Sequence, residues 1–220
     1  MAVIHHTTMT PTKLELLATW LPEQPWYRGK GQQPELARTG GFRLDDPKGE
    51  VGIEFMAVTD TSGAEPVTYQ VPFSYRGAPL AGADEALIGT TEHGVLGQRW
   101  VYDGTRDPVL VAQLFALVVG EAVPQMQSTS DTVDPSVTGW FAESGTTAEI
   151  ASTTATDGPH GTDLVVETAA DGHRLTLHIN RVLQPGQGAG EQALGHVTAN
   201  APLPDGSTAR TAFAVVHATP

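Results

Sequence analysis

The sequence contains no cysteine in its 220 residues. Disulfides, thiolate zinc sites and cysteine nucleophiles are therefore excluded. Lysine is also scarce: only Lys13, Lys30 and Lys48 are lysines among 12 basic residues, and the formal net charge is −13. Nucleic acids and anionic membranes bind proteins through basic patches, so we expect neither as a partner.

Long apolar runs are missing as well. No window approaches the roughly 18 apolar residues of a membrane-spanning helix. The N-terminal residues 1–6 show no basic region followed by an apolar run, the pattern of a signal peptide. We therefore expect a cytoplasmic protein.

Glycine and proline, by contrast, are abundant. The chain has 24 Gly and 16 Pro, with 40% hydrophobic and 17% charged residues. This composition is typical of a folded protein with many turns and short strands. The length allows one large domain or two small ones.

The first half shows strand and helix signals in alternation. Residues 2–6 are expected to form a short strand. A helix is expected to follow, with Thr10 as its N-cap and Pro11 at its first position. Pro22 is expected to end this helix. Its apolar stripe recurs at helical spacing and consists of Leu14, Leu17, Ala18 and Leu21.

A sheet is expected next, after a polar, glycine-rich connection over residues 29–49. Residues 51–56 alternate between apolar and other positions, which predicts a half-buried strand. Residues 67–73 are expected to return as its hairpin partner, with Pro72 indicating a sheet edge or a bulge. A third strand is expected over residues 94–102. The pair Asp107-Pro108 then predicts the start of an apolar helix over residues 109–119.

The second half differs in pattern. Residues 125–145 are polar and predict a linker, so we expect a first domain at 1–123, a linker at 124–146 and a second domain at 147–220. No helix is expected after Val119. The second domain is expected to be antiparallel β, with strands at 164–168, 174–182, 192–198 and 208–217 and a tight turn at Asp171-Gly172.

The segment Trp20-Leu21-Pro22-Glu23-Gln24-Pro25-Trp26-Tyr27-Arg28-Gly29-Lys30-Gly31 is the most informative stretch of the chain. Its two tryptophans bring large apolar areas, and its prolines make the connection stiff. We interpret it as an aromatic clasp that holds a helix against a sheet. Its polar and aromatic residues, together with one arginine further along, form a candidate interaction surface for a sugar ring or an acidic partner: Trp26, Tyr27, Arg28, Lys30 and Arg43.

Four segments together resemble a known family. They are the Trp20–Gly31 segment, Tyr69-Gln-Val-Pro-Phe-Ser-Tyr-Arg76, Ile88-Gly89 and Val101-Tyr-Asp-Gly-Thr-Arg-Asp-Pro108. In this order they resemble the N-terminal cap domain of actinobacterial maltokinases, over roughly residues 1–120. The first segment departs from the family, which usually has Arg-Trp-Phe where this chain has Pro25-Trp26-Tyr27. The resemblance implies an α+β fold: a cystatin-like curved antiparallel sheet with a packed helix, followed here by a smaller antiparallel β domain.

The resemblance also implies a metabolic setting. Maltokinases make maltose 1-phosphate for α-glucan synthesis and often pair with trehalose synthase. Their kinase body, however, has no counterpart in this chain. His160-Gly161-Thr162-Asp163 is superficially similar to a kinase catalytic loop, but it lacks the downstream metal-binding Asn and is followed by a predicted strand. No phosphate-binding Gly-rich loop with lysine is present. We therefore expect no kinase activity and no cofactor.

The histidines give no stronger signal. His5 and His6 are neighbours on an expected strand and so face opposite sides. Glu92 and His93 fit a polar turn as well as an acid–base pair. His173 and His178 are expected on opposite faces of their strand. None of these arrangements predicts a metal site.

Three functions remain open at this point. The first is a non-catalytic accessory or regulatory protein that binds a protein partner in maltose, trehalose or α-glucan (glycogen) metabolism. The second is a carbohydrate-binding module for α-glucan oligosaccharides. The third is a component of a maltokinase-related sugar kinase that needs a partner subunit.

Overall fold

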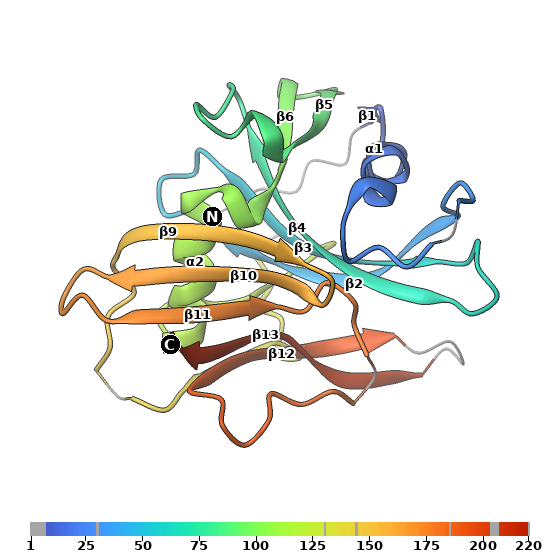
Figure 1. Ribbon diagram of the computed structural model, residues 1–220. Coiled ribbons are helices and arrows are strands. Elements are labelled where there is room, and N and C mark those ends of the chain that lie inside the picture. The colour runs from blue at the N-terminus through green and yellow to red at the C-terminus, as the bar shows by residue number, and fades with distance from the viewer. Residues whose placement is uncertain are drawn as a thin grey trace.

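The described residues of the chain fold into two antiparallel sheets with two α-helices (Figure 1). The computed structural model describes residues 8–29, 31–129, 131–143, 145–184, 186–202 and 207–219. The seven-stranded sheet has the order β1-β5-β6-β4-β3-β2-β7, and the six-stranded sheet has the order β8-β12-β13-β11-β10-β9. The α+β fold class expected from the sequence is thereby confirmed.

The bounds of the elements follow the chain order. The seven-stranded sheet contains β1 (Met9–Thr10), β2 (Leu36–Asp45), β3 (Gly52–Asp60), β4 (Val67–Arg76), β5 (Leu87–His93), β6 (Gly97–Asp103) and β7 (Gln125–Met126). The six-stranded sheet contains β8 (Thr138–Phe141), β9 (Ile150–Gly158), β10 (Gly161–Thr168), β11 (Arg174–Ile179), β12 (Gly195–Pro202) and β13 (Thr208–Ala218). The helices are α1 (Lys13–Trp20) and α2 (Pro108–Val119), with short 3₁₀ turns η1 (Leu21–Glu23), η2 (Asp84–Ala86) and η3 (Gly104–Arg106).

Helix α1 begins two residues later than the sequence analysis predicted. Thr12, not Thr10, is the N-cap, because Thr12 forms a capping box with Glu15. The Thr12 N–H donates to Glu15 Oε2 at 2.7 Å, and the Glu15 N–H donates to Thr12 Oγ1 at 3.3 Å. The expected end at Pro22 is confirmed, since α1 gives way to the η1 turn that contains this proline. The strand expected over residues 2–6 lies outside the described residues.

Strands β2 and β3 correct two expectations. The stretch predicted as a connection contains β2, whose Phe42 and Leu44 are buried. The strand was not predicted because its glycines interrupt the apolar pattern. Its pairing with β3 is irregular between Arg38 and Gly40. Strand β3 was expected to be half-buried, but its residues are buried on both faces since a helix packs on each side of the sheet.

Pro72 marks neither a sheet edge nor a bulge in the pairing with β3, contrary to the prediction. Strand β4 lies inside the sheet, and it pairs with β6 only from Phe73 onward. Before that point it bonds to residues 181–183 of the second half: the Gln70 N–H donates to the Arg181 carbonyl at 2.9 Å. N–H groups two residues apart point the same way, so the Pro72 nitrogen faces the gap between these two pairings. The proline therefore removes no ladder hydrogen bond.

The hairpin of β5 and β6 replaces the single third strand that was expected over residues 94–102. The apolar helix is confirmed: α2 is capped by Asp107, which accepts from the Val109 N–H at 2.9 Å. Gly120 ends it in the left-handed conformation.

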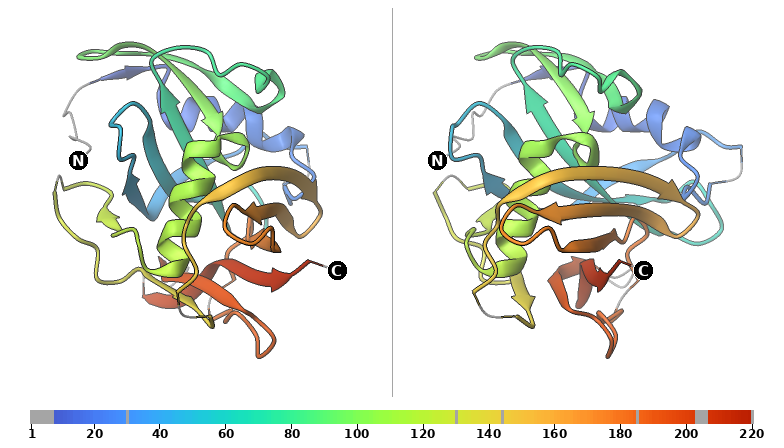
Figure 2. Two further views of the ribbon diagram at one scale, coloured as in Figure 1. Left: turned by 90° about the vertical axis from the view of Figure 1, so that its left-hand side faces the viewer. Right: turned by 60° about the vertical axis from the view of Figure 1, so that its left-hand side comes forward.

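Helix α2 lies between the two sheets and joins them into one core (Figure 2). Its residues Leu110, Leu114 and Phe115 share a buried cluster with β3 on one side and with β10 to β13 on the other. Helix α1 covers the opposite face of the seven-stranded sheet, where a second cluster contains Leu17, Trp20 and Trp26. No helix in the described part of the chain is long and apolar enough to cross a membrane.

The described part of the second half holds the four strands that the sequence analysis expected, at slightly different bounds, and three more. Strand β9 was missed because its Ser and Thr residues give no apolar alternation. Strand β8 lies within the segment expected as a linker, and β7 lies there too. The division into two domains and a linker stays a prediction.

Strand β8 packs closely against the end of α2. This packing can be tested by a substitution at Gly139. A Cβ at Gly139 would lie 1.9 Å from the Leu117 carbonyl oxygen, so the strand must move away from the helix. We expect Gly139→Ala to lower the free energy of unfolding by about 2–3 kcal/mol in urea titrations. The control is Gly188→Ala, where a Cβ meets no atom within 4 Å and a change within about 0.5 kcal/mol is expected. Equal effects of the two substitutions would contradict this packing.

Candidate functional site

The predicted aromatic clasp is present, and its two tryptophans are buried. The Trp20 and Trp26 rings lie 5.7 Å apart between centroids, and Trp26 lies 5.9 Å from Tyr69. Tyr27 also packs against Tyr69, with 5.5 Å between the ring centroids. These contacts hold the end of α1 and the η1 turn against β4, which is the packing role that the sequence analysis assigned to this segment.

Trp26 is therefore not part of an exposed surface. Only 1% of the residue is accessible, because it lies under the guanidinium of Arg181, whose Cζ is 5.0 Å from its ring centroid. Tyr27 is half-buried and Arg28 is exposed. The Tyr27 hydroxyl donates to Asp60 at 2.8 Å; burial, then this hydrogen bond and the Asp60 charge, raise the pKa of Tyr27 to about 12.

The other two residues of the predicted surface, Lys30 and Arg43, are not found beside Tyr27 and Arg28. Lys30 lies outside the described residues. Arg43 lies on β2 opposite Glu54 of β3, whereas Tyr27 binds Asp60 at the other end of β3. Six residues of strand span about 20 Å. Of the predicted set, the structure therefore places only Tyr27 and Arg28 together near the surface.

Arg181 is a buried charge with partners from both halves of the chain. It is fully buried, and its Nη2 donates to Asp103 Oδ2 at 2.5 Å and to Thr105 Oγ1 at 3.1 Å. Its Nε donates to Thr162 Oγ1 at 2.8 Å. Its Nη1 has no hydrogen-bond acceptor among the described residues. The Trp26 ring beneath the guanidinium offers a favourable cation–π contact instead.

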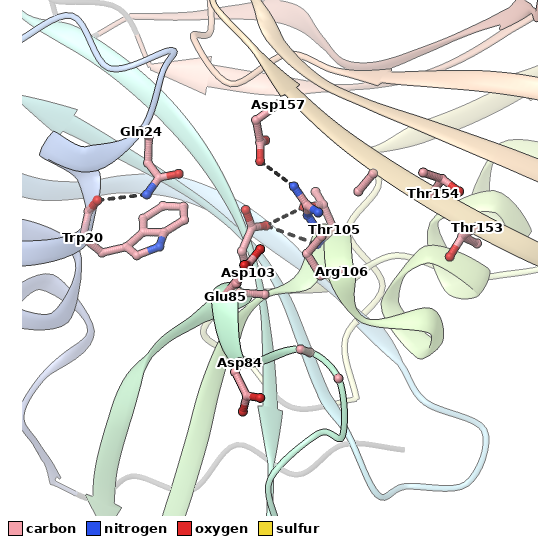
Figure 3. Close-up of a pocket in the computed structure, with 14 residues that line it drawn as sticks. Trp20, Gln24, Asp84, Glu85, Asp103, Thr105, Arg106, Thr153, Thr154 and Asp157 are labelled. Carbon is pink, nitrogen blue, oxygen red and sulfur yellow. Dashed lines mark hydrogen bonds and ion pairs between the residues drawn. The ribbon is translucent and has the colours of Figure 1, made fainter.

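A cleft of about 680 Å³ opens in front of this network. We call it the seam cleft, because its walls come from both halves of the chain. Its lining residues are Trp20, Gln24, Gly82, Ala83, Asp84, Glu85, Ala86, Asp103, Thr105, Arg106, Thr153, Thr154, Ala155 and Asp157. Figure 3 shows Trp20 and Gln24 on one side of the cleft, with Thr153 and Thr154 of β9 across from them.

A salt bridge crosses the cleft wall between η3 and β9. The Arg106 Nη2 donates to Asp157 Oδ2 at 2.8 Å, and the Thr162 hydroxyl donates to the other oxygen at 2.5 Å. Burial would raise the pKa of Asp157. The hydrogen bonds from Thr162 and Arg106 and the charges of Arg181 and Arg106 outweigh burial, and they hold this pKa below its ordinary value.

The cleft carries unbalanced negative charge. Asp103 is paired with Arg181 and Asp157 is paired with Arg106. Asp84 and Glu85 are exposed in η2, and within the described ranges they have neither a hydrogen-bonded side-chain partner nor an ion pair. No lysine is found among the described residues that line the cleft. The described residues contain no group of three or more His, Asp or Glu residues that could hold a metal ion. The arrangement can accept hydrogen bonds and attract a cation, and it disfavours a phosphate group.

Sequence reasoning missed the cleft as a site, although it flagged part of its wall. Trp20 and Gln24 belong to the aromatic clasp, and Asp103, Thr105 and Arg106 belong to the quoted segment Val101–Pro108. Asp157 and Arg181 carried no local signal, because their partners lie 51 and 78 residues away along the chain. The histidines lie elsewhere: His178 Nδ1 is 2.6 Å from Asp163, and His93 Nδ1 accepts from the Val95 and Leu96 N–H groups.

Asp103 is expected to be needed for folding because it neutralises Arg181. The substitution Asp103→Asn leaves a fully buried guanidinium without a counter-charge. We expect the free energy of unfolding to fall by about 3–5 kcal/mol, measured by urea denaturation at pH 7. The matched control is Asp163→Asn, whose carboxylate is 55% exposed beside His178. Loss of an exposed pair changes stability by about 0–1 kcal/mol, so similar losses in both variants would contradict the assigned role.

The lowered pKa of Asp157 predicts a pH dependence of stability. In the unfolded chain this carboxyl titrates near its ordinary value of about 4. Its contribution to stability is therefore complete above about pH 4 and is lost as the pH falls through the lower folded value. We expect Asp157→Asn to be less stable than the wild type at pH 7, and this difference to shrink between pH 5 and pH 2. Urea titrations across this range measure it, and a difference independent of pH would contradict the assignment.

Comparison with known proteins places most of the cleft-lining residues within a family domain. Residues 20–107 match the model of the maltokinase N-terminal cap domain. No curated protein matches the chain. The matched segment begins at Trp20, ends at Asp107 and includes every cleft residue from Trp20 to Arg106, whereas the β9 wall lies outside it. The chain therefore contains a maltokinase N-terminal cap domain, and this domain forms the larger part of the seam cleft.

Proposed function

We propose that the protein is a non-catalytic, cytoplasmic accessory protein linked to maltose, trehalose or α-glucan metabolism, and that it acts by binding a protein partner. The cap domain supports the metabolic link. The observation that carries the binding role is the seam cleft itself. It is a preformed, acidic cavity between the cap domain and the second sheet, and Asp84 and Glu85 are held at its rim.

The second half supports a role without phosphoryl transfer. His160 of the segment that is similar to a kinase catalytic loop lies, together with Pro159, in the turn between β9 and β10. Its Asp163 is hydrogen-bonded to His178, and its Thr162 donates to Asp157. These residues hold the sheet together. A nucleotide also needs a cation on its phosphates, and the chain has no lysine after Lys48.

A specific observation favours a second candidate function, the binding of an α-glucan oligosaccharide. The cleft combines an aromatic edge at Trp20 with the Gln24 amide and the carboxylates of Asp84 and Glu85. Sugars are recognised by aromatic side chains together with polar groups that fix their orientation. A volume of about 680 Å³ falls within the usual range of ligand pockets.

Calorimetry separates these functions. We expect the protein to bind the trehalose synthase or an α-glucan-synthesising enzyme of its own cell at micromolar concentration. We also expect the double variant Asp84→Asn, Glu85→Gln to weaken this binding at least about tenfold, since it removes the unbalanced charge of the cleft. The control is Glu191→Gln, an exposed carboxylate outside the cleft lining, which should leave the affinity unchanged.

Three results would contradict the proposal in different ways. Absence of association at micromolar concentration would overturn the accessory role. Binding of maltotriose with a change in tryptophan fluorescence, lost in the same double variant, would favour the carbohydrate module. Release of ADP with maltose, ATP and magnesium would show that the protein is a kinase after all.

A further inference from the structure

One wall of the seam cleft is the free edge of a strand. Strand β9 is the last strand of the six-stranded sheet, and in the described part of the chain it pairs only with β10. Its residues Thr153, Thr154, Ala155 and Asp157 line the cleft. With nine residues, the strand presents an edge of about 30 Å.

The hairpin that joins β9 to β10 identifies which backbone groups point into the cleft. Residues 159 and 160 form a two-residue turn, so Gly158 and Gly161 close it as a hydrogen-bonded pair. Bonded and non-bonded pairs alternate along an antiparallel ladder. The N–H and C=O groups of residues 153, 155 and 157 therefore point away from β10. Over the described ranges, no backbone hydrogen bond from these groups to another segment is found.

This edge lacks most of the protection that natural edge strands carry. Such strands are usually blocked by lysine, proline or a cover of other elements. Residues 152–156 are Ser, Thr, Thr, Ala and Thr, whose small side chains leave the backbone accessible. Open N–H and C=O groups in a groove are the means by which proteins capture an extended peptide as an additional strand.

The charge of the groove indicates what kind of peptide fits. Asp84 and Glu85 lie at the rim of the same cleft, and Arg106 is already neutralised by Asp157. A segment with lysine or arginine side chains complements this rim. A second copy of the chain does not, because it has the same acidic rim and a net charge of −13.

We propose that the seam cleft docks an extended, basic segment of the partner protein, which pairs with the free edge of β9 as a seventh strand of that sheet. This inference rests on the proposed accessory function and specifies the part of the partner that is bound. Backbone hydrogen bonds to residues 153, 155 and 157 give the affinity, and contacts of basic side chains with Asp84 and Glu85 give the selectivity.

The experiment uses the full chain as bait for a displayed library of random nine-residue peptides. We expect enriched peptides to carry Lys or Arg among β-forming residues and to lack central proline. A synthetic copy of the best peptide is then titrated by fluorescence anisotropy. We expect Thr153→Pro, which removes a free N–H without touching the β10 ladder, to weaken binding at least about tenfold. Thr153→Ala keeps the N–H and should change the affinity by less than about twofold. Circular dichroism melts of both variants confirm that the fold is retained.

Several outcomes overturn the inference. Enrichment of acidic or proline-rich peptides, equal binding by Thr153→Pro and wild type, or no enriched peptide at all would each do so. A dimer that forms with increasing concentration and is lost in Thr153→Pro would assign the edge to a second copy instead. If the partner enzyme still binds Thr153→Pro with unchanged affinity, the strand-addition inference fails while the accessory function stands. If no enzyme binds but the peptide does, the accessory function fails while the strand-addition inference stands.

Discussion

The buried guanidinium of Arg181 is the interaction on which the arrangement of this molecule depends. Its chain segment, residues 180–183, bonds to β4 of one sheet and to β13 of the other. Its side chain joins Asp103 and Thr105 of the cap domain to Thr162 of β10. A charge that is fully removed from water requires all of these partners at once. The positions of η3, β10 and the aromatic clasp are therefore coupled, and the cleft in front of them has a defined shape.

This coupling explains why the aromatic clasp lies in the interior. Two tryptophans close to two prolines could serve a surface or a core, and the sequence alone left both uses open. Arg181 decides between them, because a buried cation is stabilised by an aromatic face and Trp26 provides one. Of the described residues of the clasp, only Trp20 and Gln24, at its start, line the cleft. The clasp thus supports the site by packing Trp26 against Arg181. Tyr27 and Arg28 lie at the outer surface.

Local signals predicted the parts of the fold that local interactions determine. Helix α2 follows from the cap at Asp107, the adjoining proline and an apolar run, and the hairpin of β3 and β4 follows from alternation around a turn. Strand β2 was missed because its glycines interrupt the apolar pattern, and strand β9 was missed because its Ser and Thr residues give no apolar alternation. The site follows the same rule. Its cap-domain residues lie in segments that the sequence marked, whereas Asp157 and Arg181 act through contacts that no local pattern reveals.

The physical consequence is a division of roles between the two halves. The cap domain contributes the charge of the cleft through Asp84 and Glu85, while the second sheet contributes an open strand edge with little charge of its own. Neither half makes the groove alone, because the edge of β9 needs a facing wall and the wall needs Arg106 anchored on Asp157. The described groups that face the cleft accept hydrogen bonds and attract cations, and no lysine is among them to bind a phosphate.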